Sequence, residues 1–290
     1  MENTKGKLKE YMKDYIKLLR IKHYIKSLLI FMPLFFAGSF FNKENIIKAV
    51  EGFICFCLIS SAVYILNDYR DIEKDKKHPT KCNRPLASGK IKPKNAIILM
   101  TVCLIVVAIM SWHIGNINAA FFLILYFILN IAYSMGLKNV PIIDVVILAS
   151  GFVIRLFYGG YVTGVEISKC LYLVVTTGSL YMGLGKRRNE LKKQLDTREV
   201  LKYYNSPFLD KNMYVCVALA NVFYALWTVE MNNRAMIWTV PFFMVILMCY
   251  SLDAEGDSDG DPVEVILKDK ILIGLILVYA ICIFFLIYVI

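Results

Sequence analysis

Residues 46–75 read IIKAVEGFICFCLISSAVYILNDYRDIEKD, and they join an apolar run to a cluster of acids. The first part, 46–66, supplies roughly the 20 mainly apolar residues that a helix needs to cross the hydrocarbon core of a bilayer. The last part, 67–75, contains an asparagine, three aspartates and a glutamate. The stretch therefore predicts a transmembrane helix that ends in acids at one face of a membrane.

The remainder of the chain has the same character. Of its 290 residues, 58% are hydrophobic and only 19% are charged, which is typical of a polytopic membrane protein. Membrane-length apolar runs occupy residues 25–41, 46–66, 95–114, 119–135, 141–163, 169–185, 212–229, 236–252 and 271–290. We therefore predict an all-α membrane protein with nine transmembrane helices, organised as a single domain over 1–290.

The distribution of basic residues predicts the orientation. With the N-terminus in the cytoplasm, 28 of the 33 lysines and arginines fall on cytoplasmic segments, counting Lys26 at the start of the first apolar run, as the positive-inside rule requires. The long loops 67–94, 186–211 and 253–270 also fall on that side, so we expect a multi-pass cell-membrane protein with a cytoplasmic active site. The net charge of +10 at this face favours anionic headgroups and polyanionic substrates. No nucleic-acid partner is expected.

Four side chains of the acidic segment are predicted to form a metal site. With 100° per helical residue, they share an arc of roughly 100°. They are Asn67, Asp68, Asp71 and Asp75. Oxygen ligands on one face suit Mg²⁺, which takes one or two protein carboxylates together with substrate phosphates. We predict that these four residues are catalytic Mg²⁺ ligands; the alternative is a solvated helix end whose charges only mark the membrane boundary.

Several segments resemble the UbiA superfamily of intramembrane prenyltransferases. NDYRDIEKD (67–75) is similar to the first aspartate motif of that superfamily, and HPTKCNRPLASGKI (78–91) to the loop that follows it. YSMGLKNVPIIDV (133–145) resembles its YSxxLK segment, and HYIKSLLIFMPLFFAG (23–38) adds to the likeness. The resemblance implies nine transmembrane helices around a central cavity.

The chain departs from this family where a second aspartate motif is expected. That position reads YMGLGKRRNELKKQL (181–195), so cations replace acids. Cations there would repel a second Mg²⁺ and attract a phosphate. Together with GFVIRLFYGG (151–160) and DPVEVILKD (261–269), this form resembles the branch that makes polyprenyl-phosphoryl phosphoribose. The branch implies phosphoribosyl pyrophosphate (PRPP) as donor and a polyprenyl phosphate, such as decaprenyl phosphate, as acceptor.

These substrates bring three phosphate-bearing groups to the site, so we expect several cations around one metal. The predicted substrate-binding residues are Lys26, Tyr64, Lys81, Arg84, Lys90, Lys138, Asp144, Arg155, Lys186 and Arg187. Arg155 lies 11 residues beyond Asp144 within a predicted span, where a charge costs about 2.5–3.5 kcal/mol, so it is expected to meet an anion. The alternative for Arg155 is an internal pair with Asp144, and Asp144 is itself expected to orient Lys138 or Arg155.

The resemblance implies a Mg²⁺-dependent transfer of 5-phosphoribosyl from PRPP to a polyprenyl phosphate. One alternative is an ordinary UbiA-type prenyltransferase with a prenyl diphosphate donor and an aromatic or heme acceptor. Another is a transporter or lipid-binding protein without chemistry. The sequence leaves open the polyprenyl chain length, the downstream pathway, the number of metal ions and the oligomeric state.

Overall fold

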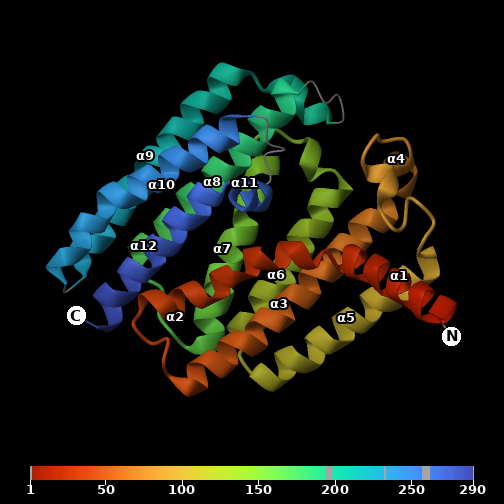
Figure 1. Ribbon diagram of the computed structural model, residues 1–290, viewed down its shortest axis with the longest axis horizontal. Helices are drawn as coiled ribbons and strands as arrows, with labels where there is room; N and C mark the ends of the chain where they lie inside the picture. Colours follow the sequence, from red (N-terminus) through yellow and green to blue (C-terminus); the bar gives the residue numbers. More distant parts are fainter. Residues whose placement is uncertain (1, 194–197, 232, 257–261, 290) are drawn as a thin grey trace.

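The computed structural model describes residues 2–193, 198–231, 233–256 and 262–289. Within these residues every regular element is a helix, which confirms the predicted all-α fold (Figure 1). The long helices are α1 (Glu2–Leu19), α3 (Lys43–Arg70), α5 (Pro93–Ile114), α6 (Ile117–Met135), α7 (Ile143–Thr163), α8 (Lys169–Lys192), α9 (Ser206–Glu230), α10 (Thr239–Glu255) and α12 (Lys270–Tyr288). The short ones are η1 (Ile21–Phe31), α2 (Met32–Phe36), α4 (Ile72–Lys76), η2 (Lys81–Asn83), η3 (Leu137–Asn139), η4 (Glu199–Tyr203), η5 (Arg234–Trp238) and α11 (Pro262–Lys268). Asp261 of the DPVEVILKD segment lies outside the described residues.

Seven helices of the described residues are long and apolar enough to cross a membrane. They are α3, α5, α6, α7, α9, α10 (extended by η5) and α12. The predicted count of nine is not confirmed. The first predicted span, 25–41, is divided between η1 and α2, each too short to count alone, and α8 has 24 residues but a more polar sequence.

Most long helices that follow one another in the chain pack side by side, as α6 does with α7 and α7 with α8, whereas α5 packs mainly on α3. The turn from α5 to α6 consists of Gly115, with a φ of +69°, and Asn116, whose side chain accepts the backbone N–H groups of Asn118 and Ala119. Because successive long helices run in opposite directions, the C-terminal ends of α3, α6 and α8 meet the N-terminal end of α7 at one face (Figure 1).

The segment before α3 lies against both α3 and α7. Its main element, η1, is a 3₁₀-helix of 11 residues, which rises about 2.0 Å per residue rather than 1.5 Å. Together with α2 it extends roughly 30 Å, the thickness of a hydrocarbon core. The hydroxyl of Tyr24 lies 2.8 Å from that of Ser61 on α3 and ties the two elements together.

Gly159 allows α7 to touch η1. A Cβ atom at this position would lie 2.2 Å from the carbonyl oxygen of Ile30, so no larger residue fits without moving one of the two backbones. Gly178 on α8 differs, because nothing lies within 4 Å of the corresponding Cβ position.

We expect Gly159→Ala to lower the free energy of unfolding by about 1–3 kcal/mol or more, because it forces η1 and α7 apart. Gly178→Ala is the matched control and should be neutral or slightly stabilising, since alanine favours the helix. Unfolding of both variants by SDS titration in mixed micelles measures the difference. Equal stability of the two variants would contradict the assigned contact.

Candidate functional site

The predicted acidic cluster lies where α3 ends. Asp68 is in its last turn, Asp71 caps it, and Asp75 follows on α4. The turns are nearly continuous, because the backbone N–H of Asp71 bonds Asn67 at 3.0 Å and that of Asp75 bonds Asp71 at 2.8 Å. Asp68 and Asp75 are consequently buried on one side of the helix, as the helical spacing predicts, with exposures of 3% and 4%.

Arg84 joins these two carboxylates. Its Nη1 donates to Asp68 Oδ1 at 3.0 Å and to Asp75 Oδ2 at 2.7 Å. Arg20, which sequence reasoning missed, donates from Nη2 to the same Asp68 Oδ1 at 2.5 Å and stacks 4.7 Å above the Tyr64 ring. Within the described chain, Asp68 Oδ2 and Asp75 Oδ1 receive no hydrogen bond. Each buried carboxylate thus keeps one oxygen for a further ligand.

The end of α6 completes this side of the site. The hydroxyl of Ser134 donates to the side-chain oxygen of Asn67, and Lys138 Nζ on η3 lies 3.9 Å from Asp71 Oδ1. Asp71 is more exposed than its two neighbours, with 34% of its side chain accessible. The end of α6 and η3 therefore lie beside Asn67 and Asp71.

Arg187 forms a second charged group with the start of α7. Its Nε donates to Asp144 at 2.5 Å, its Nη1 to Glu190, and its Nη2 to the Tyr133 hydroxyl at 3.0 Å. The side chains of Arg187 and Asp144 are both completely buried. Arg187 is therefore surrounded by protein groups.

The prediction that Asp144 orients Lys138 or Arg155 is wrong. Instead of Lys138 or Arg155, Asp144 binds Arg187 and accepts the hydroxyl of Tyr204 at 2.6 Å. Burial and this hydrogen bond raise the pKa of Tyr204 to about 12, so the hydroxyl stays a donor at neutral pH. The cause of the error is packing, since α8 and the loop after it bring Arg187 and Tyr204 to Asp144.

Arg198 is a second residue that sequence reasoning missed. Its Nη1 donates to the Tyr133 hydroxyl at 2.8 Å, and its Nε lies 3.4 Å from Glu190. Burial alone would raise the pKa of Glu190, but the cations of Arg187, Arg198 and Lys186 outweigh it and hold this pKa below its usual value. Arg198 belongs to no recognisable motif, and only its place in the basic loop 186–211 marked it.

Lys81 on η2 lies within electrostatic range of both charged groups. Its pKa is lowered by burial and by the cations of Arg84 and, further along the chain, Arg198, while Asp75 opposes the shift. Both guanidinium groups therefore lie within electrostatic range of this ammonium. The loop after α4 and the loop after α8 converge here.

Arg155 is buried within α7, with an exposure of 4%. It donates to the hydroxyls of Ser27, Ser60 and Tyr126 and to the carbonyl of Gly151, and its guanidinium lies 4.7 Å from the Phe56 ring. Ser60 precedes Asp68 by eight residues on α3, or about 12 Å. All of these protein partners are neutral.

The remaining predicted residues lie around the edges. Lys90 pairs with Asp14 of α1 at 3.7 Å, away from the acidic cluster. Lys26 is half-buried on η1 next to Ser27, and Lys186 is half-buried at the end of α8. Among the described residues, no group of three or more His, Cys, Asp and Glu side chains lies close enough together to hold a metal ion, so Asp68, Asp71 and Asp75 do not form a complete carboxylate site by themselves.

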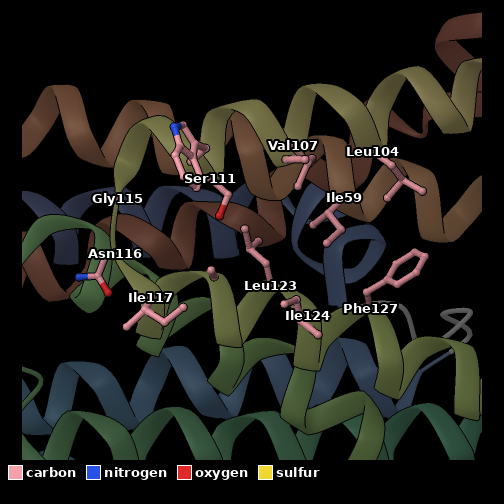
Figure 2. A pocket seen from close by; sticks show the side chains of 13 residues that line it. Ile59, Leu104, Val107, Ser111, Gly115, Asn116, Ile117, Leu123, Ile124 and Phe127 are labelled. Atoms are coloured by element: carbon pink, nitrogen blue, oxygen red, sulfur yellow. The ribbon is translucent and has the colours of Figure 1, made fainter.

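A groove of about 640 Å³ between α5 and α6 is not part of this site. It is lined mainly by apolar side chains, including Leu104, Leu123 and Phe127, with Ser111 and Asn116 at one end (Figure 2). Asn116 belongs to the α5–α6 turn, whereas the acidic cluster meets the opposite end of α6. The groove therefore opens near the other end of the bundle.

Comparison with known proteins identifies relatives over nearly the whole chain. The model of the UbiA prenyltransferase family matches residues 28–262. The decaprenyl-phosphate phosphoribosyltransferase of Corynebacterium glutamicum is 34% identical, over 94% of this chain and 86% of that protein. The protein of the same name from Mycolicibacterium smegmatis is 32% identical, over 93% and 91%.

Solved structures share the fold. A UbiA homologue from Archaeoglobus fulgidus, bound to GPP and Mg²⁺, superposes with a TM-score of 0.70 and 18% identity, over 93% of this chain and 99% of that one. At this identity the likeness concerns the arrangement of helices alone.

We expect Asp144→Ala to lower the free energy of unfolding by about 3 kcal/mol or more, because it removes one partner of a completely buried ion pair. Asp210→Ala is the control: its partner Arg188 is 18% exposed and Asp210 itself 29%, so the loss should be about 1 kcal/mol or less. SDS titration measures both. A loss for Asp144→Ala no larger than that for Asp210→Ala would contradict the prediction.

Proposed function

Because the chain belongs to the UbiA prenyltransferase family, we propose that it is a membrane enzyme that transfers 5-phosphoribosyl from PRPP to a polyprenyl phosphate and releases diphosphate. The observation that carries this proposal is the identity of 31–34% with named decaprenyl-phosphate phosphoribosyltransferases over about nine-tenths of the chain. The cations Lys186 and Arg198 beside Glu190 support it, because PRPP has a phosphate apart from its diphosphate.

The charges around the site favour such a donor. Seven basic side chains gather there: Arg20, Lys81, Arg84, Lys138, Lys186, Arg187 and Arg198. Five carboxylates oppose them: Asp68, Asp71, Asp75, Asp144 and Glu190. The excess of positive charge, increased further by a divalent cation, is suited to an anion with several phosphates.

The acidic cluster fits Mg²⁺. Asp68 and Asp75 each keep one carboxylate oxygen without a hydrogen bond among the described residues, and the Nη1 of Arg84 shows that positive charge is accommodated between them. Mg²⁺ takes one or two carboxylates and completes its coordination with water and phosphate oxygens. We assign Asn67, Asp68, Asp71 and Asp75 as its ligands. When bound, Mg²⁺ neutralises negative charge on the departing diphosphate.

The chemistry requires no general base, because the acceptor phosphate is already anionic at neutral pH. An oxygen of this phosphate forms a bond to C1 of the ribose while the bond from C1 to the diphosphate breaks, and the diphosphate leaves with the electron pair. Attack from the opposite face converts the α-linked donor into a β-linked product. Arg84 and Lys138 hold and orient the diphosphate beside Asp71, so positioning and electrostatics supply the rate.

The other predicted residues are assigned by their location. Lys26 and Arg155 lie on η1 and α7, towards the membrane interior from Asp68, and we assign them to the acceptor. Tyr64 and Lys81 lie next to the acidic cluster and are assigned to the donor. Lys90, paired with Asp14, and Asp144, paired with Arg187, support their neighbours. The excess of basic residues at this end of the bundle supports a cytoplasmic site in a single domain.

Purified protein with Mg²⁺, labelled PRPP and decaprenyl phosphate should yield a labelled lipid. Asp71→Ala should lower the rate by about 100-fold or more, because it removes a residue that supports charge neutralisation at the leaving group. Glu73→Gln is the control, because Glu73 is exposed and pairs only with Lys76, and it should keep full activity. Turnover of a prenyl diphosphate without use of PRPP would instead establish an ordinary prenyltransferase.

A further inference from the structure

Arg198 joins the candidate site from a part of the chain far from the acidic motif. Its guanidinium contacts Tyr133 at the end of α6 and Glu190 at the end of α8. Both of these partners are themselves fixed by the buried Arg187. The side chain of Arg198 is therefore held by residues that are themselves fixed, although Arg198 lies in a loop.

The guanidinium of Arg198 is only partly used by the protein. Its Nε faces Glu190 and its Nη1 bonds Tyr133, but no described residue accepts a hydrogen bond from Nη2. The side chain is 26% exposed, in contrast to that of Arg187, which is completely buried. Two N–H groups of a planar guanidinium are thus available to an anion.

The surroundings of Arg198 favour a phosphate. Burial lowers the pKa of Lys81 on the loop after α4, and the cations of Arg84 and Arg198 lower it further against the opposing effects of Asp75 and Glu190, so cations of both loops interact here. An anion bound between the two loops would relieve this repulsion. Arginine is well suited to bind it, because its fork of N–H groups matches the oxygens of a phosphate.

We propose that Arg198 is a specificity-determining residue that binds a phosphate monoester of the substrate, namely the 5-phosphate of the donor. This inference rests on the proposed function. The chemistry would also suit the phosphate of the lipid acceptor. The donor is favoured, because Arg198 lies in the polar loop after α8, outside every helix that could cross the membrane.

The test compares Arg198→Gln with the wild-type protein on two donors: PRPP, and ribose 1-diphosphate, which lacks the 5-phosphate. Loss of a charged hydrogen bond should raise the KM for PRPP about 10- to 100-fold, with a smaller change in kcat. The KM for decaprenyl phosphate should stay constant. On ribose 1-diphosphate the variant and the wild type should be equally poor, because the group that Arg198 binds is missing.

Two further variants isolate the role of the guanidinium. Arg198→Lys keeps the charge without the fork, so its KM for PRPP should lie between those of the wild type and Arg198→Gln. Lys202→Gln removes an exposed cation from the adjacent η4 and should leave all constants unchanged. Thermal unfolding of each variant in detergent should match that of the wild type, as expected for a residue that binds substrate rather than supports the fold.

Three results for Arg198→Gln would overturn the inference and leave the proposed function standing. An unchanged KM for PRPP in Arg198→Gln would exclude the contact, and a raised KM for decaprenyl phosphate alone would assign Arg198 to the acceptor. An equal loss on both donors would indicate a structural role. A wild-type protein that does not use PRPP at all would overturn the proposed function as well, so the two failures are distinguishable.

Discussion

Arg84 donates from a single nitrogen to two buried carboxylates, Asp68 and Asp75. Without a cation between them, two acids this close would repel each other in a region of low dielectric, and one of them would have to take up a proton. The contact fixes the loop after α4 against the end of α3. Asp68 also accepts a hydrogen bond from Arg20 of the N-terminal segment. The geometry of the acidic cluster thus depends on basic residues brought from both sides of it in the sequence.

The acidic cluster around Asp68 and the charged group around Arg187 compensate for the burial of their charges in different ways. Asp68 and Asp75 each use one oxygen for arginine and keep the other for a ligand. Arg187 is instead saturated by Asp144, Glu190 and Tyr133, and its exposure is zero. The first arrangement is suited to binding. The second joins α6, α7 and α8 and makes a firm base for the residues around it.

Local features of the sequence were sufficient to predict much of this structure. The apolar runs predicted the helices, because hydropathy and length decide whether a segment crosses a membrane. The grouping of Asp68 with Asp75 followed from the helical repeat, since the turns between them are nearly continuous. The predicted set of Asn67, Asp68, Asp71 and Asp75 as metal ligands stays a prediction.

Features that depend on packing between distant segments could not be predicted. Asp144 and Arg187 are 43 residues apart, and the sequence around each of them does not indicate that the two form an ion pair. Arg20 and Arg198 belong to no motif, and they matter only because η1 and the loop after α8 approach the helix ends. The predicted count of nine spans is not confirmed, because the first predicted span is divided between η1 and α2 and α8 is more polar than the seven helices that qualify.

The 3₁₀ geometry of η1 determines which of its side chains reach the bundle. With three residues per turn, positions separated by three are eclipsed and form a straight column instead of a drifting stripe. Tyr24, Ser27 and Ile30 occupy such a column: the side chains of Tyr24 and Ser27 meet Ser61 and Arg155, and the backbone of Ile30 meets Gly159. The tighter winding of η1 thereby aligns three contacts, one with α3 and two with α7, along one face of this segment. In an α-helix, residues three apart are offset by about 60° around the axis, so Tyr24, Ser27 and Ile30 would no longer lie in one column. The hydroxyl of Ser27 would then turn away from the guanidinium of Arg155.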